Sequence, residues 1–425
     1  MSTVLAAGLL ITCLSAAASD PATVALTLDQ YFSAALQRSE VVATQSELIR
    51  QAEERYRQAG GALHPTLSGI ASYTWQDSGA RDVTASPTRQ PLARITATQP
   101  LFRGFREFAA VRQSQALVDA QGADYQNARV QLFKDVVLNF YDVLTLEQEL
   151  KNLDEQFEQY QLREKELADR VRIGRSRPGE TLTVQSTVST LRAQVEQRKA
   201  ELSAAREVFA FLSGLPASTP LYDTETIPAD AGTLDAYLAR LTLRPDVKAA
   251  RQRLSAAQEN ISVVRGEHLP SLDLNANRYL ERTGALENVE WDVQLALTVP
   301  LYAGGSVQSR VREAQSKGTQ AELGVSQIQR QAEQEIRSLY QSVTLDRSQL
   351  AALEMATDAA RKNYETQQHD YRLGLVTNLD VLQALSAFQE NQRAFDRARY
   401  NAKLNYLKLQ AATVRRPVPA EGTAP

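Results

Sequence analysis

Side chains that could carry out chemistry are few in this sequence and far apart. The three histidines, His64, His268 and His369, lack the short spacing that places two ligands on one metal ion. The only cysteine is Cys13 and the only internal methionine is Met355, so a sulfur-lined path for Cu(I) has little support. No glycine-rich phosphate-binding motif is present. The sequence therefore predicts a protein that is not an enzyme and that holds no cofactor or metal.

Charge and hydropathy narrow the class of protein further. The net charge is −3 over 425 residues and no basic block occurs, so the sequence gives no sign of a nucleic-acid partner. No internal stretch approaches the roughly 20 apolar residues of a membrane helix. The strands of a membrane barrel carry a much weaker signal and are not excluded.

The N-terminus has the features of an export signal. An apolar segment spans 4–14 and alanines occupy 16–18, as they do before a cleavage site. We predict a signal peptide over 1–18, with a buried N-terminal helix as the alternative because the first residues include no Lys or Arg. Cys13 lies inside this segment, but Thr12 stands where a lipoprotein motif usually has a smaller residue. Lipidation of Cys13 is therefore the less favoured interpretation.

One unit of about 200 residues occurs twice in the chain. The stretch "QPLFRGFRE" (99–107) is nearly repeated by "VPLYAGGSV" (299–307), and "TLDQY" at 27 has its counterpart in "TLDAY" at 233. In both copies a proline ends a predicted strand and glycine follows before a helical stretch. The predicted strand–helix junctions are Pro100, Gly104, Pro300, Gly304 and Gly305. The predicted organisation is a first repeat (19–213), an equatorial linker (214–232), a second repeat (233–413) and a disordered tail (414–425).

The positions of proline predict the helices, because proline breaks a helix interior. Two long proline-free stretches predict helices of about 68 residues, or roughly 100 Å, and four shorter helices would each span roughly 50 Å. Two short helices placed end to end therefore match one long helix. The predicted helices are 106–173, 306–373, 27–60, 180–213, 235–266 and 380–413. Four such columns are too elongated for a globular core and are expected to be walls of a larger structure.

Four stretches alternate between apolar and polar residues: 67–76, 93–101, 272–280 and 289–301. Strands of about ten residues with one apolar face match those of a transmembrane barrel, and a sheet covering a soluble core is the alternative. Both tryptophans, Trp75 and Trp291, fall at the hairpin-loop end, where they would form a girdle at the membrane interface. Four strands cannot close a barrel, and open edges are not tolerated in lipid. The chain is therefore expected to form an oligomer.

Three motifs resemble those of the TolC family of outer membrane efflux proteins. They are "RPDVKAARQRLSAAQENISVVRGEHLPSL" (244–272), "VPLYAGGSVQSRVREAQ" (299–315) and "YRLGLVTNLDVLQA" (371–384), and the likeness extends over about 26–413. The resemblance implies a fold that is mainly α with a transmembrane β-barrel, in which long coiled-coil-like helices form an α-barrel. It also implies a homotrimer in the outer membrane of a Gram-negative bacterium, with four barrel strands from each chain.

The resemblance also implies a gate at the periplasmic end of the helices. In the family, acidic side chains just past the helix turns form rings that narrow the entrance. Asp380 matches that position, Glu180 is its counterpart in the first repeat, and Gln383 stands where a second acid often follows. Tyr371 matches the family's tip tyrosine. Val376 occupies the position of an arginine that restrains the closed tip in other members, so that restraint cannot operate here.

The two turns at this end would dock a periplasmic adaptor, which the family connects to an inner-membrane pump of RND, MFS or ABC type. The residues expected to dock are Arg172, Gly174, Arg175, Ser176, Arg372, Gly374, Leu375, Val376 and Thr377. The first turn also carries four arginines that could offset the acidic ring, or could only solvate a helix end or favour its dipole: Arg170, Arg172, Arg175 and Arg177. The predicted function is an exit duct for small molecules or proteins, and the alternative is a periplasmic coiled-coil scaffold without a pore. The sequence does not identify the cargo.

Overall fold

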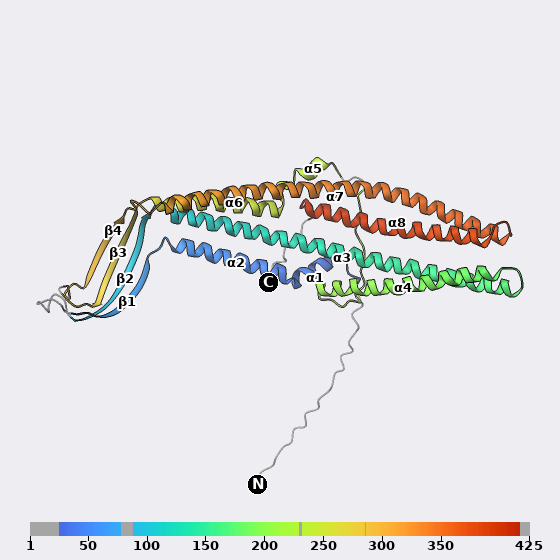
Figure 1. The fold of residues 1–425 in the computed structure, drawn as a ribbon, viewed down its shortest axis with the longest axis horizontal. Coiled ribbons are helices and arrows are strands. Elements are labelled where there is room, and N and C mark those ends of the chain that lie inside the picture. Colours follow the sequence, from blue (N-terminus) through green and yellow to red (C-terminus); the bar gives the residue numbers. More distant parts are fainter. Residues whose placement is uncertain (1–24, 78–87, 229–231, 285, 417–425) are drawn as a thin grey trace, which may run out of the picture.

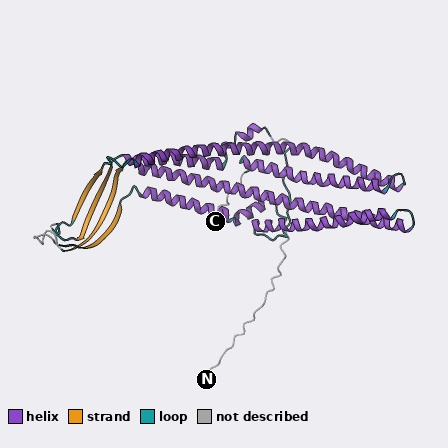
Figure 2. Ribbon diagram, in the orientation of Figure 1, coloured by secondary structure: helices purple, strands orange, loops and turns teal. Residues whose placement is uncertain are grey.

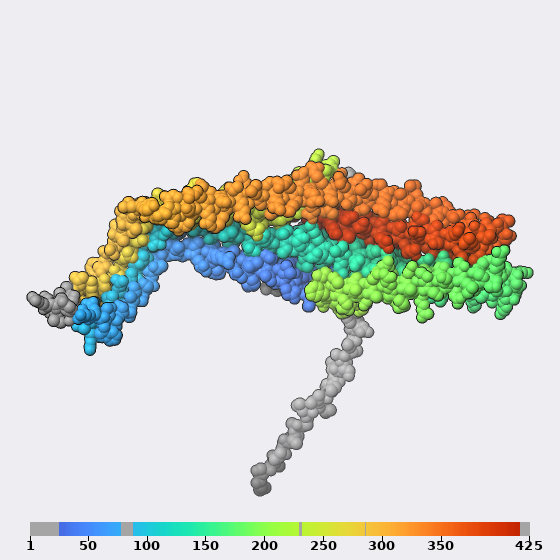
Figure 3. Space-filling view, viewed as in Figure 1, coloured from blue at the N-terminus to red at the C-terminus, as the bar shows by residue number. Residues whose placement is uncertain are grey.

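The computed structural model describes residues 25–77, 88–228, 232–284 and 286–416, arranged as a long helical body with a small sheet at one end (Figure 1). The predicted signal peptide, Cys13 and residues 417–425 lie outside the described residues. The space-filling view shows that the sheet bends away from the long axis of the helices (Figure 3).

Two helices run almost the whole length of the helical body. They are α3 (Arg106–Arg172) and α7 (Ser306–Arg372), of 67 residues each, and they confirm the predicted long helices to within one residue. Helices α4 (Pro178–Ser213) and α8 (Asn378–Ala412) agree with the prediction nearly as well. At 1.5 Å per residue the long helices span about 100 Å.

The other two predicted short helices are interrupted. The stretch 27–60 forms α1 (Leu28–Arg38) and α2 (Glu40–Gly61), because Ser39 is extended and its side chain accepts a hydrogen bond from the N–H of Val42. The prediction of one helix over 235–266 is wrong. This stretch forms α5 (Leu234–Leu238), a 3-10 turn (Leu241–Leu243) and α6 (Pro245–Arg265). Pro245 has no N–H to donate, so it occupies the first position of a new helix rather than the interior of a longer one.

The helices form four columns. Helices α2 and α4 lie end to end along one side of α3, and α6 and α8 lie end to end between α3 and α7 (Figure 1). The first two strands and the last two strands continue from these columns at one end of the body (Figure 2). The α2–α4 column and α7 are therefore the two outer edges of the chain.

The sheet contains β1 (Thr66–Trp75), β2 (Arg89–Arg103), β3 (Ser271–Glu281) and β4 (Trp291–Thr298), antiparallel and in that order. The strand register confirms the predicted faces. Ala97 pairs with Leu67 on one side and with Ala276 on the other, and Ala276 pairs with Val293. These apolar residues therefore share one face, on which Leu67 is 75% exposed in the single chain.

The opposite face of the sheet is polar and hydrogen-bonded across the strands. Asn277 accepts a hydrogen bond from Thr96 at 2.7 Å and donates one to Asp292 at 2.8 Å. Thr98 donates to Asn275 at 2.8 Å in the same way. An apolar face and a polar face with hydrogen bonds across the strands match a sheet that lies between lipid and water.

The predicted strand–helix junctions differ between the two copies. At the end of β2, Gly104 is buried and adopts a positive φ of 70°. The next residue, Phe105, also has a positive φ (58°), a conformation that disfavours a side chain, whereas its counterpart is Gly305. Pro100 lies within β2 beside a register shift, and Pro300 lies two residues beyond the end of β4.

An apolar core lies where α1, α3, α4 and α8 meet. It includes Tyr31, Phe140 and Phe209, all with no exposed surface. The hydroxyl of Tyr31 donates to Asn139 at 2.7 Å, so this buried polar group is satisfied. The predicted tail begins at 414, and its first residues also contact this region, because Arg416 forms ion pairs with Asp29 and Glu225.

Candidate functional site

The two turns that join α3 to α4 and α7 to α8 lie together at the end farthest from the sheet (Figure 2). Gly174 and Gly374 have positive φ values of 71° and 78°, which close the two turns in the same way. The N–H of Gly374 donates to the carbonyl of Tyr371, and the N–H of Leu375 donates to that of Asp370 at 2.9 Å. Space around both glycines is open, and Leu375 is 71% exposed. The predicted docking turns thus present small and apolar groups to solvent.

Asp380 is held by the start of its own helix. Its carboxylate accepts hydrogen bonds from the hydroxyl and the N–H of Thr377, at 2.6 and 2.8 Å, and the N–H of Asp380 in turn faces the Thr377 hydroxyl. These hydrogen bonds lower the pKa of Asp380 below its usual range. The carboxylate is therefore charged at neutral pH and also caps α8.

Glu180 occupies the corresponding first turn of α4. Its carboxylate accepts a hydrogen bond from Ser176 at 3.0 Å. A cavity of about 310 Å³ lies between the two turns, and its lining includes Glu180, Arg177, Thr377 and Asn378. The structure therefore brings one predicted gate residue together with a predicted docking residue. Gln383, one turn farther along α8, is exposed and does not line this cavity.

A cluster that sequence reasoning missed joins the two turns. The guanidinium groups of Arg163 and Arg170 lie 4.2 and 4.7 Å from the ring centre of Tyr371. Arg163 also donates to Asn378 at 2.8 Å and pairs with Glu166 at 2.7 Å. We call these five residues the tip clasp. The seven-residue spacing of Arg163 and Arg170 places them on one face of α3, but nothing in the sequence shows that this face meets Tyr371.

The other arginines of the first turn are exposed. Arg172 is paired at 3.2 Å with Asp169 on the same helix, and its side chain is 78% exposed. Arg175 and Arg177 are exposed as well, and so is Arg372 on the second turn. A salt bridge at this exposure adds little stability. These cations remain available to a partner.

Polar side chains connect α3 and α8 over 149–159 of α3 and 389–397 of α8. Glu149, only 6% exposed, accepts a hydrogen bond from Arg397 at 2.6 Å, Asn152 donates to Asp396 at 2.9 Å, and Gln389 donates to Gln159 at 3.1 Å. We call this segment of the contact the polar seam; its residues are Glu149, Asn152, Gln156, Gln159, Gln389, Arg393, Asp396 and Arg397.

The interior between α3 and α4 has the opposite character. Leu153 and Leu167 of α3 pack against Val184 and Leu191 of α4, and Leu385 of α8 is buried in the same cluster. The two hairpins, α3–α4 and α7–α8, are therefore joined both by this apolar cluster and by the hydrogen bonds and ion pairs of the polar seam.

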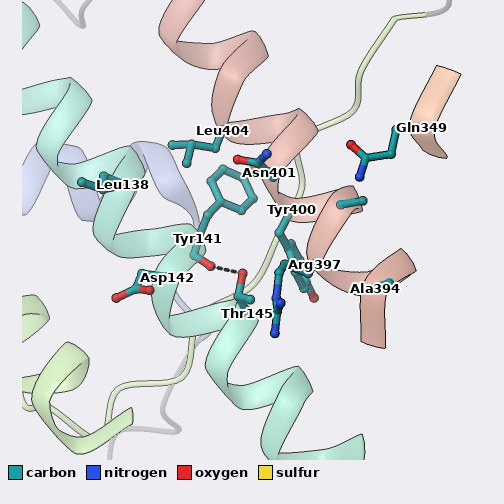
Figure 4. A pocket seen from close by; sticks show the side chains of 11 residues that line it. Leu138, Tyr141, Asp142, Thr145, Gln349, Ala394, Arg397, Tyr400, Asn401 and Leu404 are labelled. Atoms are coloured by element: carbon teal, nitrogen blue, oxygen red, sulfur yellow. Dashed lines mark hydrogen bonds between the residues drawn. The ribbon is translucent and has the colours of Figure 1, made fainter. Parts of the chain in front are cut away.

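A second cavity, of about 410 Å³, lies between α3 and α8, farther from the two turns (Figure 4). Leu138 and Asp142 approach it from α3, and Arg397, Asn401 and Leu404 from α8. Partial burial, followed by the nearby charges of Glu201 and Glu149, raises the pKa of the Asp142 carboxyl. The lining brings no nucleophile beside a general base.

The described residues also give no support to a metal site or a helical membrane anchor. Nowhere in the described part of the chain do three His, Cys, Asp or Glu side chains come close enough together to hold a metal ion. None of the helices described carries an apolar stretch of the length that a membrane crossing needs.

Comparison with known proteins places the chain in a family. The family described as "Outer membrane efflux protein" matches residues 31–215 and 238–414. TolC of Escherichia coli strain K12 is 23% identical over 378 residues, which cover 84% of this chain and 76% of TolC. The alkaline protease secretion protein AprF of Pseudomonas aeruginosa is 24% identical over 414 residues, covering 91% of this chain and 82% of AprF.

The fold is similar to that of a solved relative. A crystal structure of CusC superposes with a TM-score of 0.81 at 19% identity and covers 92% of each chain. CusC of Escherichia coli strain K12, named as a cation efflux system protein, is 22% identical over 384 residues, covering 86% of this chain and 81% of CusC. The predicted TolC-like fold class is confirmed, and with it the location in the Gram-negative outer membrane, extending into the periplasm. The chain belongs to the outer membrane efflux protein family.

Proposed function

We propose that three copies of this chain form the exit duct of a tripartite efflux or secretion system. The observation that carries this proposal is the sheet, whose apolar face is exposed in the single chain and whose four strands leave both edges open. Three chains would supply enough strands for a closed barrel, with the apolar face toward lipid and the polar face toward the lumen. The roughly 100 Å columns would continue the duct across the periplasm.

The duct is a conduit and not an enzyme in this proposal. The described cavities bring together no catalytic set of side chains, and the family is one of efflux proteins. A scaffold without a pore would have no use for a sheet that is apolar on one face and hydrogen-bonded and polar on the other.

The tip would bind a periplasmic adaptor, and through it an inner-membrane pump of RND, MFS or ABC type. The two glycine turns are exposed, carry apolar groups and have open space around them, which suits close approach of a partner helix. AprF and CusC are named for protease secretion and cation efflux, so the cargo class differs among relatives of similar likeness. Small molecules and proteins both remain candidate cargo for this chain.

Asp380 and Glu180 would form the acidic entrance, and the tip clasp would hold the two hairpins together while the entrance is closed. Opening would then part the hairpins along the polar seam. The support is the cluster of contacts around Tyr371, which connects α3 to both α7 and α8.

Native mass spectrometry of the detergent-extracted protein tests the assembly. The expected species contains three chains and no nucleic acid. A stable soluble monomer, found without detergent in the periplasmic fraction, would overturn the proposal.

A further inference from the structure

The cavity between α3 and α8 lies between the two inner columns of the helical body (Figures 1 and 4). Its volume of about 410 Å³ is in the range of cavities that hold small molecules. Leu138 and Asp142 line it from α3, Arg397 and Asn401 line it from α8, and Gln349 of α7 adds one polar side chain. A single chain therefore forms the whole cavity.

Much of the lining is apolar and aromatic. It includes Leu138, Leu404 and the rings of Tyr141 and Tyr400, whose centres lie 6.1 Å apart. The hydroxyl of Tyr141 donates to Asp223 at 3.3 Å, and that of Tyr400 accepts a hydrogen bond from Arg399 at 3.2 Å. Both hydroxyls are thus engaged by other residues, and the rings and aliphatic groups suit the apolar part of a ligand.

The positive charge in the lining, that of Arg397, is already balanced. Glu149 accepts hydrogen bonds from Nε and a terminal nitrogen of Arg397, at 2.9 and 2.6 Å. The same carboxylate pairs with Arg198 of α4 at 3.0 Å, and Arg198 also pairs with Glu201. Two arginines and two glutamates therefore balance one another in this network.

The negative charge in the lining, that of Asp142, has no such partner. Among the described residues, its carboxylate takes part in none of the ion pairs or hydrogen bonds between α3, α4 and α8. Partial burial raises the pKa of the Asp142 carboxyl, and the negative charges of Glu201 and Glu149 raise it further. A positive group in the cavity would balance this charge.

We propose that this cavity binds an organic cation that carries an apolar group. The positive group lies beside the Asp142 carboxylate, and the apolar group lies against the leucines and the two tyrosine rings. The side-chain amides of Asn401 and Gln349 offer further oxygen acceptors. The inference goes beyond the duct function and does not depend on the trimer, because one chain supplies every group.

Another aspartate of α3 provides a comparison. Asp135 lies two helical turns before Asp142, is also exposed, and lines a different cavity of about 370 Å³. Burial raises the pKa of its carboxyl as well, but the positive charge of Lys134 opposes that rise, and Arg38 lines the same cavity. Asp135 thus has cations nearby that Asp142 lacks.

Isothermal titration calorimetry of the detergent-extracted protein tests the choice of ligand. Benzamidine, benzamide and benzoate share a phenyl ring and are positive, neutral and negative at neutral pH. We expect saturable binding of benzamidine, binding of benzamide that is weaker by about tenfold or more, and no binding of benzoate. Absence of saturable benzamidine binding overturns the site, and equal affinity for benzamide overturns the role of the charge.

Substitutions test the location of the site. Asp142→Asn keeps the shape of the side chain and removes its charge, and it should weaken benzamidine binding by about tenfold. Asp135→Asn is the matched control on the same helix and should leave the affinity unchanged. Equal effects of the two substitutions, or no effect of either, would place the binding elsewhere.

The cavity itself is tested by Ala394→Leu, which adds bulk to the α8 side of the lining and keeps Asp142. Benzamidine binding should be lost while the thermal unfolding midpoint stays close to that of the wild type. Unchanged binding by this variant overturns the site. Native mass spectrometry of the same samples keeps the two proposals apart: a chain that is not a trimer but binds benzamidine contradicts only the duct, and a trimer that does not bind it contradicts only the site.

Discussion

Among the single residues of the tip, Asp380 combines two roles that mutation can separate. Its charge belongs to the proposed acidic entrance, and its oxygen accepts the hydrogen bonds that cap α8. The sequence located this carboxylate through the family motif. The sequence did not show that Thr377 donates hydrogen bonds to this carboxylate, because a capping box depends on where the helix begins.

The charge can be removed without removing the cap. Asp380→Asn keeps a side-chain oxygen for Thr377, whereas Asp380→Ala removes both. We expect both variants to lower the cation preference of the channel, measured as the reversal potential of single-channel currents in a salt gradient. Only Asp380→Ala should also loosen the start of α8, seen as faster amide exchange there. Unchanged selectivity in both would mean that Arg172, Arg175 and Arg177 set the field at the entrance.

The pH dependence of selectivity distinguishes an isolated carboxylate from a crowded ring. The hydrogen bonds from Thr377 lower the pKa of Asp380, so its stabilising contribution is complete above the ordinary value of about 4 and is lost only as pH falls through the lowered one. Cation preference should therefore persist down to about pH 4 in currents recorded across a pH series. Loss of preference at clearly higher pH would show that repulsion among the assembled carboxylates outweighs the cap.

The tip clasp gives a third prediction at this scale. Tyr371→Phe keeps an aromatic face for Arg163 and Arg170, whereas Tyr371→Leu removes it. If the clasp holds the entrance closed, Tyr371→Leu should raise the single-channel conductance and Tyr371→Phe should leave it close to wild type. Equal conductance in the wild type and both variants would remove the clasp from the gate.

Among the elements, the long helices were predictable and the breaks in the short ones were not. Proline-free stretches fixed α3 and α7 to within one residue. Ser39 broke a predicted helix without any proline or glycine, since its side chain caps the following helix. The prediction of one helix over 235–266 was wrong because it continued through Pro245. Proline is disfavoured in a helix interior, and here Pro245 begins α6.

The contrast between the α3–α4 interior and the polar seam predicts different costs of truncation. Leu167→Ala removes a fully buried side chain and should destabilise the hairpin by about 2–5 kcal/mol. Gln159→Ala removes one hydrogen bond, worth about 0.5–1.5 kcal/mol, from a partly exposed side chain. Thermal unfolding of the extracted protein should show a much larger loss of midpoint for the leucine variant. Equal losses would mean that the seam is packed as tightly as the interior.

For the whole molecule, the repeat and the alternating strands predicted four helical columns and four strands with one apolar face, and the resemblance to a known family supplied the barrel architecture. Alternation gives the faces of each strand, but the order and register of the strands come from pairings between residues that are about 180 positions apart. The candidate site was also predicted only in part. The glycine turns were found, whereas the approach of Arg163 to Tyr371 depends on how α3 packs against the α7–α8 hairpin, which the sequence does not show.

Docking of the adaptor can be tested on the complete system in cells. Gly374 has a positive φ of 78° and open surroundings, so a substitution there meets no neighbour within the chain. Asparagine tolerates this backbone conformation and valine does not. We expect Gly374→Val to abolish export by distorting the turn. Gly374→Asn should keep the turn and still reduce export, because its side chain would occupy the docking surface. Normal export by Gly374→Asn would place docking elsewhere.

The polar seam has a consequence for how often the duct can be used. When an apolar interface parts, it exposes surface that must be hidden again quickly or it attracts other proteins. When the hairpins separate, Asn152 can exchange Asp396 for water and Gln389 can exchange Gln159 for water, and both pairs can form again on closing. The seam therefore limits how much apolar surface each opening exposes, which favours a duct that opens and closes through many cycles of transport.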